Sequence, residues 1–444
     1  MKNKIYSIAI AALIITVLGG IWWFMKTVGE FGKPTIAFSE DIRSIGRQKI
    51  IQACFEDSGT GLREIFVSIN QNNKSRVLIA SSFPEKGVKQ KKLSLRVNPQ
   101  LLKLHDGFAV LTVATTDYSL WKNKTIIERP INIDYTPPRI SLLTPTSHIN
   151  VGGACVIAYG LSEPAPLSGV QVNNNFSQGY LGTFAGKTAV IAYFALPPEV
   201  EEKGASIKIF ARDGGGNETY VSLFPLIKKK KFRSDKMNLT DSFLNQKMGD
   251  FQPLPPELQG KDSFDIFTYI NGQMRIANEN SIRDLCRKSE PRQLWDGTFL
   301  RMKNASPMAL FGDHRTYLYG NKAIGESTHL GVDLASTANA PVEAANNGIV
   351  VFVGTLGIYG NAIIIDHGLG IFSVYGHLSS ISTKTGQTVK KGDVIGNTGT
   401  TGLAGGDHLH FGMLVGGQFV NPVEWWDPHW IKDNVADKLT NVNN

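Results

Sequence analysis

Three short motifs between residues 329 and 410 place histidine and aspartate side chains in strand-like sequence. They are THLGVD, YGHLS and GDHLHFG, which contain His329 with Asp333, His377, and His408 with His410. Alternating apolar residues and glycine-containing turns around these motifs are typical of short strands. Because the motifs are far apart in the chain, their side chains can act together only if separate strands meet, and this predicts a β-sheet domain at the C-terminal end.

The spacing inside the motifs suits a metal site. Residues i, i+2 and i+4 of a strand share a face, so His329 and Asp333 can point into one site, as can His408 and His410. Two histidines, one carboxylate and a water molecule make a hydrolytic zinc site. The chain contains no HExxH sequence, which excludes the helical zincin arrangement.

Residues of about 310–427 closely resemble the M23 peptidases, the lysostaphin and LytM type of zinc endopeptidase. The resemblance lies in THLGVDLAS, APVEAANNGIVVFVG, GNAIIIDHG, YGHLSSISTKTGQTVKKGDVIGNTGTTG and DHLHFGM. It implies one Zn²⁺ held by His329, Asp333 and His410, and two catalytic histidines, His377 and His408. It also implies an antiparallel β-sheet metallopeptidase domain, which we place at residues 301–432.

The same resemblance implies the substrate and the reaction. The expected protein is a zinc metalloendopeptidase that hydrolyses peptide cross-links of peptidoglycan through metal-activated water, with His408 as general base. His377 would hydrogen-bond the oxyanion or share the proton transfer. The alternative is a non-catalytic envelope scaffold or an activator of another wall hydrolase, and the presence of all five residues argues against it. A biotinyl or lipoyl carrier, which VKKGDVIG also resembles, leaves the histidines unexplained.

Other polar residues near the motifs have weaker signals. Tyr317 and Tyr319 are candidates for a tyrosine that lines the substrate groove. Asp366 and Asp407 are candidates for acceptors that orient the histidines. We expect His367 to be structural, and His314 to be structural or to line the groove.

The N-terminal segment predicts a membrane anchor. Lys2 and Lys4 precede an uncharged run from Ile5 to Met25, and a run of that length crosses a ~30 Å hydrocarbon core at ~1.5 Å per residue. A cleaved signal peptide is the alternative, but its apolar region is usually shorter. We expect a transmembrane anchor at 1–26, with the N-terminus in the cytoplasm and the catalytic domain in the periplasm or cell-wall space.

Two β-sandwiches are expected between the anchor and the catalytic domain. Short strands and turns fill this region, and a weak internal repeat relates segment 52–70 to 153–173 with a period near 100 residues. Such a period is typical of tandem immunoglobulin-like sandwiches, here at 36–136 and 137–228. The fold class is therefore mainly β: two sandwiches, a short helical linker block and the peptidase sheet.

Residues 229–300 are expected to form a basic, Pro-rich and partly helical linker. They begin with KKKKFR and include a helical pattern at 263–288. We hypothesise that the segment 234–300 covers the catalytic groove until a partner or proteolysis moves it. The formal net charge of +8 favours anionic partners such as an acidic wall polymer. We expect peptidoglycan, the membrane and possible envelope proteins bound through the sandwiches as partners, and no nucleic acid.

Overall fold

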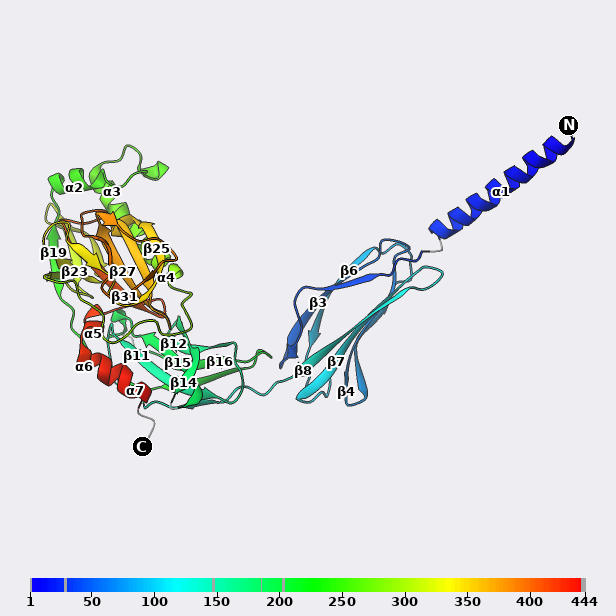
Figure 1. Ribbon diagram of the computed structural model, residues 1–444, viewed down its shortest axis with the longest axis horizontal. Helices are drawn as coiled ribbons and strands as arrows, with labels where there is room; N and C mark the ends of the chain where they lie inside the picture. Colours follow the sequence, from blue (N-terminus) through cyan, green and yellow to red (C-terminus); the bar gives the residue numbers. More distant parts are fainter. Residues whose placement is uncertain (1, 28–29, 146–147, 185, 202–203, 441–444) are drawn as a thin grey trace. The chain divides into compact units, whose positions relative to one another are not determined.

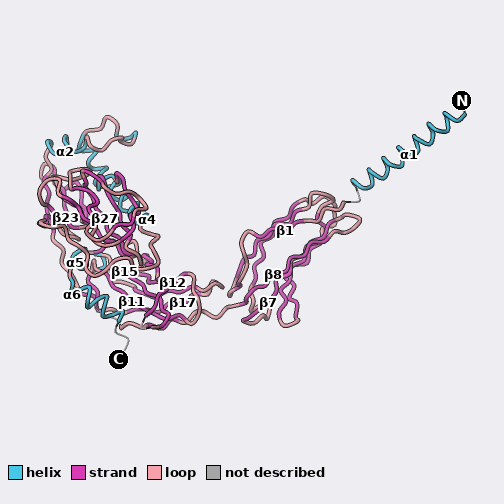
Figure 2. Tube along the Cα trace, viewed as in Figure 1, coloured by secondary structure: helices cyan, strands magenta, loops and turns pink. Residues whose placement is uncertain are grey.

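The computed structural model describes residues 2–27, 30–145, 148–184, 186–201 and 204–440. Its residues form two compact units. The first unit contains residues 1–138, 164–166 and 212–218, and the second contains 139–163, 167–211 and 219–444. Strands dominate both units (Figure 1 and Figure 2), so the predicted mainly β fold class is confirmed.

A single helix begins the chain. Helix α1 spans Lys2–Thr27, where the sequence predicted a membrane anchor. None of the helices within the described residues is both long enough and apolar enough to cross a membrane. The transmembrane span expected at 1–26 is therefore not supported by the described residues.

The first unit contains a sandwich of two sheets whose strands pair mostly in antiparallel fashion. One sheet has the order β1-β3-β6 and the other β2-β8-β7-β4-β5. In β3 and β4 the buried residues alternate with more exposed ones, so each sheet turns one face towards the core. The strands are β1 Thr35–Phe38, β2 Ser44–Ile45, β3 Lys49–Glu56, β4 Leu62–Gln71, β5 Lys74–Ser82, β6 Gln90–Val97, β7 Gly107–Asp117 and β8 Lys124–Ile133.

A second sandwich belongs to the second unit. Its sheets have the orders β14-β15-β11-β9 and β13-β12-β16-β17, and β10 pairs in parallel with β18. The strands are β9 Ile140–Leu142, β10 His148–Asn150, β11 Ala154–Leu161, β12 Leu167–Val172, β13 Asn175–Gln178, β14 Tyr180–Phe184, β15 Lys187–Ala195, β16 Ile207–Arg212, β17 Glu218–Leu223 and β18 Leu226–Lys228. The three cysteines, Cys54, Cys155 and Cys286, are free.

An eight-stranded sheet forms the core of the C-terminal domain. Its order is β20-β23-β31-β27-β26-β25-β29, with β32 paired to β31. Strands β27 and β31 are buried along their whole length, because other elements cover both faces of the sheet. Its strands are β20 Ser306–Ala309, β23 Val332–Ala335, β25 Gly348–Thr355, β26 Asn361–Asp366, β27 Ile371–Leu378, β29 Thr388–Val389, β31 Leu409–Val415 and β32 Gln418–Val420. A smaller sheet contains β24 Pro341–Glu343, β28 Ser380–Ile381 and β30 Val394–Asn397.

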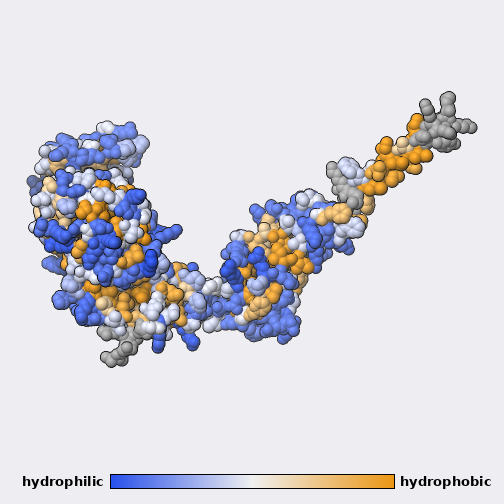
Figure 3. Space-filling view, in the orientation of Figure 1, coloured by the Kyte–Doolittle hydropathy of each residue, from blue (hydrophilic) through white to orange (hydrophobic). Residues whose placement is uncertain are grey.

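The expected linker is part of the same hydrophobic core. Strand β19 (Ser234–Asn238) pairs in parallel with β21 (His314–Tyr319), which pairs with β22 (Lys322–Thr328). Helices α2 (Asp241–Met248), α3 (Ser263–Tyr269) and α4 (Arg275–Leu285) follow, with the π-helical segment η3 (Ile270–Met274) between α3 and α4. The visible outer surface around α2 and α3 is mostly hydrophilic (Figure 3), whereas Ile270 and Ile282 are fully buried. This block, residues 234–285, is therefore a packed element of the second unit.

The C-terminal helices join the eight-stranded sheet to the second sandwich. Helix α5 (Pro422–Trp426) is followed by α6 (Pro428–Ile431), the π-helical η5 (Lys432–Ala436) and α7 (Asp437–Thr440). The Glu424 carboxylate accepts hydrogen bonds from Asn150 Nδ2 at 2.6 Å and from the Ala154 backbone N–H at 3.0 Å. These contacts lie within the second unit and fix its sandwich against the C-terminal domain.

Trp425 should matter for stability. Its side chain is fully buried and packs edge-on against Trp295 and Phe299. We expect Trp425→Ala to lower the free energy of unfolding by about 3–5 kcal/mol, the usual cost of removing a buried aromatic ring. Chemical denaturation of the second unit would measure it. Val423→Ala, at a side chain that is 45% exposed, is the control and should change stability little.

Candidate metal and catalytic site

Three potential metal ligands converge at the edge of the large sheet. His329 precedes β23, Asp333 lies in β23, and His410 lies in β31, where the antiparallel register places it opposite Asp333. His329 Nε2 lies 2.9 Å from Asp333 Oδ1 and 3.1 Å from His410 Nδ1, and His410 Nδ1 lies 3.0 Å from Asp333 Oδ1. All three residues are buried. The triad that the sequence predicted is thus brought together by strand pairing.

The hydrogen bonding of His329 leaves its Nε2 suited to a cation. Its Nδ1 lies 3.0 Å from the Leu310 carbonyl oxygen, which only accepts, so Nδ1 carries the proton and Nε2 of the neutral ring does not. Nε2 then faces another acceptor, Asp333 Oδ1, an arrangement that a cation between them stabilises. The separations of 2.9–3.1 Å are close to the ~3.3 Å edge of a tetrahedron with metal–ligand bonds of ~2.0–2.1 Å. The donor set therefore fits a small divalent metal ion.

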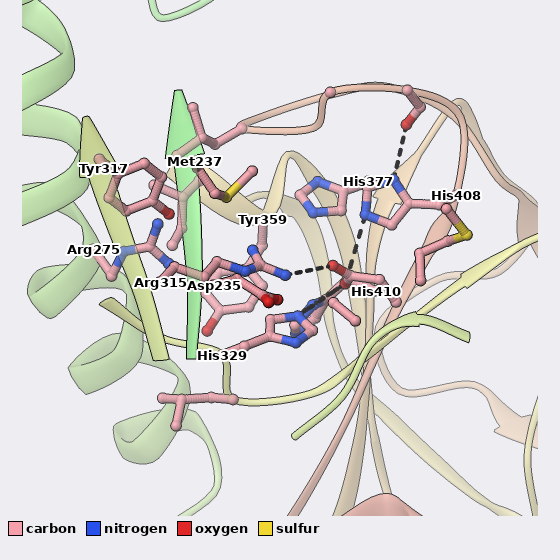
Figure 4. A pocket seen from close by; sticks show the side chains of 18 of the residues that line it. Asp235, Met237, Arg275, Arg315, Tyr317, His329, Tyr359, His377, His408 and His410 are labelled. Carbon is pink, nitrogen blue, oxygen red and sulfur yellow. Dashed lines mark hydrogen bonds and ion pairs between the residues drawn. The ribbon is translucent and has the colours of Figure 1, made fainter. Parts of the chain in front are cut away.

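His377 and His408 lie next to this triad and face each other. Their ring centroids are 4.7 Å apart, and Figure 4 shows the rings of His329, His377, His408 and His410 around one cavity. His377 Nδ1 donates to the Thr401 carbonyl at 2.8 Å and His408 Nδ1 to the Gly406 carbonyl at 2.8 Å. In the neutral rings both Nε2 atoms are therefore acceptors.

The backbone at His377 is unusual. Its φ is +64°, a left-handed conformation that side-chain-bearing residues rarely adopt. The register between β26 and β27 shifts here, with Asn361 opposite Leu378 but Ile363 opposite Tyr375, so a β-bulge contains His377. Bulges redirect side chains next to functional sites, and this one aims the imidazole into the cavity.

The surroundings of the site shift the pKa values of its groups in different directions. Burial, together with the neighbouring His408 and His410, lowers the pKa of His377 to about 3. Burial also lowers the pKa of His408, but the Asp333 carboxylate 3.6 Å from its Nε2 reverses the effect and leaves that pKa raised. Burial raises the pKa of Asp333, but the adjacent histidines outweigh it and hold the pKa well below its usual range. A carboxylate and a neutral His377 are the resulting states near neutral pH.

Arg315 is a functional candidate that the sequence analysis did not identify. It lies in β21, and its Nη2 donates to Asp333 Oδ2 at 3.0 Å, while Oδ1 faces the two histidine ligands. One carboxylate oxygen is therefore held by Arg315 and the other is left for a metal. The available signal was the alternation in HRTYLY, which places Arg315 on the same strand face as Tyr317.

The cavity at this site holds about 480 Å³ and has two walls. One wall carries the histidines of the large sheet. The other comes from β19, α3, α4 and β21, and includes Asp235 and Arg275 (Figure 4) as well as Glu279. Tyr359, which the sequence analysis also missed, lies at the cavity with its ring centroid 5.2 Å from that of His410.

The remaining candidates divide between the cavity and the framework. Tyr317 lines the cavity and is buried, whereas Tyr319 does not line it and donates its hydroxyl hydrogen bond to Asp241. The expectation that Asp366 and Asp407 orient histidines is wrong. Asp366 accepts from Ser289, Glu290 N–H and Gly368 N–H, and Asp407 accepts from Thr398 and Asn339 N–H.

The two other histidines in this region differ in burial. His367 is fully buried and hydrogen-bonds the Asn347 carbonyl and Ser373, so it has the structural role expected of it. His314 is exposed, does not line the cavity, and lies 3.3 Å from Thr328 Oγ1 through Nδ1.

Comparison with known proteins matches this region to a protein family. Residues 327–422 match peptidase family M23. A stretch of 95 residues, 21% of this chain, is 44% identical to the DD-carboxypeptidase/endopeptidase Mpg of Neisseria meningitidis, of which it covers 22%. A stretch of 96 residues, 22% of this chain, is 38% identical to the peptidoglycan DD-endopeptidase ShyA of Vibrio cholerae, of which it also covers 22%. The match thus spans about a fifth of the length of these curated relatives.

A solved structure resembles a larger part of the chain. The crystal structure of a putative peptidase M23 from Pseudomonas aeruginosa aligns with 62% of this chain and 93% of its own, with a TM-score of 0.41 and 21% sequence identity. Residues 327–422, the part of the chain that matches peptidase family M23, carry all five clustered side chains: three lie in β23, β27 and β31, and His329 and His408 lie just before β23 and β31.

Proposed function

We propose that the protein is a zinc-dependent endopeptidase that hydrolyses peptide cross-links of peptidoglycan. The observation that carries the proposal is the convergence of His329 Nε2, Asp333 Oδ1 and His410 Nδ1 within 2.9–3.1 Å of one another, beside two histidines whose Nε2 atoms are acceptors. These three atoms would hold one Zn²⁺. The name of one relative, the peptidoglycan DD-endopeptidase ShyA, supports peptidoglycan as the substrate.

The cavity side chains have distinct roles in this reaction. Bound zinc supplies an activated water molecule and polarises the scissile carbonyl. His408 Nε2 accepts the proton of that water as general base, because its Nδ1 proton is committed to Gly406. His377 Nδ1 is likewise committed to Thr401, so its Nε2 must gain a proton before it can donate to the oxyanion or leaving amine. Sharing of the proton transfer is thus the role that its hydrogen bond favours.

The place of action follows from the proposed substrate. Peptidoglycan lies outside the cytoplasmic membrane, so we place the catalytic domain in the periplasm or cell-wall space. Protein partners at the two sandwiches stay a prediction from the sequence.

Digestion of purified peptidoglycan tests the proposed function. The full chain is incubated with intact sacculi, and the soluble products are identified by mass spectrometry. We expect cross-linked peptide dimers to disappear with release of new amino termini, chelator to stop the reaction, and added Zn²⁺ to restore it. Binding to sacculi without hydrolysis in the presence of Zn²⁺ would instead indicate a scaffold or activator.

Arg315 should strengthen metal binding by fixing the orientation of Asp333. Arg315→Ala leaves Asp333 Oδ2 without this partner, and loss of an outer-shell partner typically weakens metal affinity ~10–100-fold. Arg315→Lys keeps the charge and should restore part of the affinity. Competition with a chromogenic chelator measures Zn²⁺ affinity without any turnover. Lys322→Ala on the neighbouring strand is the matched control and should bind as the unchanged protein does; equal affinity in Arg315→Ala would contradict the assignment.

A further inference from the structure

The cavity wall opposite the histidines contains three arginines with different partners. Arg233 pairs with Asp235 at 2.9 Å and with Asp313 at 2.8 Å. Arg315 pairs with Asp333 at 3.0 Å. Arg275, at the start of α4, forms no ion pair with any of the residues that the structure describes. Its charge is therefore available to a ligand in the cavity.

Asn271 holds the Arg275 guanidinium in place by one edge. Nε lies 3.3 Å from both the backbone oxygen and Oδ1 of Asn271, and Nη2 lies 3.0 Å from Oδ1. Asn271 is itself buried, one turn earlier on the same helical face. These bonds use the Nε side of the fork and leave Nη1 for another acceptor. Figure 4 shows Arg275 in the cavity wall beside Tyr317 and Arg315.

The helix that carries Arg275 is anchored to the peptidase domain. Asn278 Oδ1 accepts from the Ile358 backbone N–H at 2.9 Å, and Ile282 on the same face is fully buried. The loop that Asn278 contacts continues into Tyr359, which lines the same cavity as Asp333. Arg275 is thus pre-positioned relative to the metal-type site, which reduces the entropy cost of holding a ligand.

Glu279, the acidic residue one turn after Arg275, is not ion-paired with it. It lines the cavity, but no contact within 4.0 Å between its carboxylate and Arg275 occurs among the described residues. Burial raises the pKa of Glu279, and the charges of Arg275 and Arg283 offset part of that rise. The Arg275 side of the cavity therefore keeps a cationic group with unused donors.

We propose that Arg275 is a specificity-determining residue that binds a free carboxylate of the peptide substrate. The substrate identity rests on the proposed peptidoglycan hydrolysis. The inference adds the chemical class that the wall of the cavity selects, which is an acidic peptide rather than its amidated form. A guanidinium with a free end suits a carboxylate, and a hydrogen bond between charged partners is stronger than one to a neutral amide. A carboxamide in that place would offer one acceptor and no charge.

Binding of matched peptides tests this proposal without requiring turnover. The probes are an end-labelled Ala-Glu-Lys-Ala tetrapeptide with free Glu and C-terminal carboxylates, and two versions in which one or the other carboxylate is amidated. Fluorescence anisotropy is recorded within seconds of mixing with the full zinc-loaded chain. We expect amidation of one carboxylate to weaken binding ~10–100-fold, as for loss of a charged hydrogen bond.

Variants assign that preference to one side chain. Arg275→Gln should bind the acid and amide forms equally, and Arg275→Lys should retain part of the preference. Arg287→Gln, at an exposed arginine just beyond α4, is the matched control and should retain all of it. A folding defect would weaken all three probes together, and melting curves identify it. Equal binding of acid and amide by the unchanged protein, or a preference that survives in Arg275→Gln, would overturn the proposal.

Hydrolysis measured on the same preparations separates this proposal from the proposed function. Loss of a contact that binds the substrate and the transition state equally should raise KM for the acidic substrate and leave kcat nearly unchanged. If the acid preference depends on Arg275 but no fragments are released from peptidoglycan, the proposed hydrolysis fails and the carboxylate subsite stands. If fragments are released at equal rates from acidic and amidated wall, the hydrolysis stands and the subsite fails.

Discussion

His410→Ala is expected to lose both the bound zinc and the turnover, whereas His408→Ala keeps the zinc and loses only the turnover. His410 Nδ1 is one corner of the triad with His329 and Asp333, so its removal leaves two ligands. His408 Nε2 lies 3.6 Å from Asp333 and is assigned to the proton transfer. A positioned general base typically contributes 10²–10⁴-fold in rate, and we expect a kcat loss in that range.

Metal analysis and steady-state hydrolysis on the same samples separate the two roles. His314→Ala is the matched control, because this exposed histidine does not line the cavity, and it should retain both metal and rate. Two results would contradict the assignment: zinc lost from His408→Ala as completely as from His410→Ala, or full activity of the unchanged protein after its zinc is removed.

A protein made of residues 300–444 alone should be less stable and less active than the full chain. It lacks buried Phe267, Ile270 and Ile282, which pack in the same core as the peptidase sheet. It also lacks β19, so β21 loses the strand that places Asp235 opposite Arg315. Removing three large buried apolar side chains costs several kcal/mol, at about 1.5–3 kcal/mol each. Thermal unfolding and hydrolysis of sacculi would measure both effects.

The hypothesis that residues 234–300 cover the groove expects the opposite result, a gain in activity on their removal. The block forms one wall of the cavity and supports Arg315. Its removal should therefore lower the activity. A protein of residues 139–444 is the control, because it lacks most of the first unit and keeps nearly all of the second. A soluble, folded 300–444 protein with higher activity than that control would show that the block inhibits.

The parts of the fold that were predicted from sequence depend on local patterns. Alternating apolar residues predicted the sandwiches, and the motifs around His329, His377 and His410 predicted a shared site. Those patterns work because a strand with one buried face has period two, and because the i, i+4 and i, i+2 spacings put side chains on one face.

The parts that were missed depend on pairing between distant segments. No local pattern reveals that β19 pairs with β21, so the block at 234–285 was taken for a linker. Arg315 and Arg275 were missed for the same reason, since their importance comes from Asp333 and Asn271 at the cavity and not from their own sequence context. The left-handed backbone at His377 likewise arises from a bulge opposite β26.

The central claim is that His329, Asp333 and His410 hold one zinc ion that the reaction requires. A crystal of the purified protein, with anomalous diffraction recorded on both sides of the zinc absorption edge, tests it most directly. The account predicts a single zinc peak per chain at ~2.0–2.2 Å from His329 Nε2, Asp333 Oδ1 and His410 Nδ1. A protein that hydrolyses peptidoglycan while showing no zinc peak at these three atoms would contradict it.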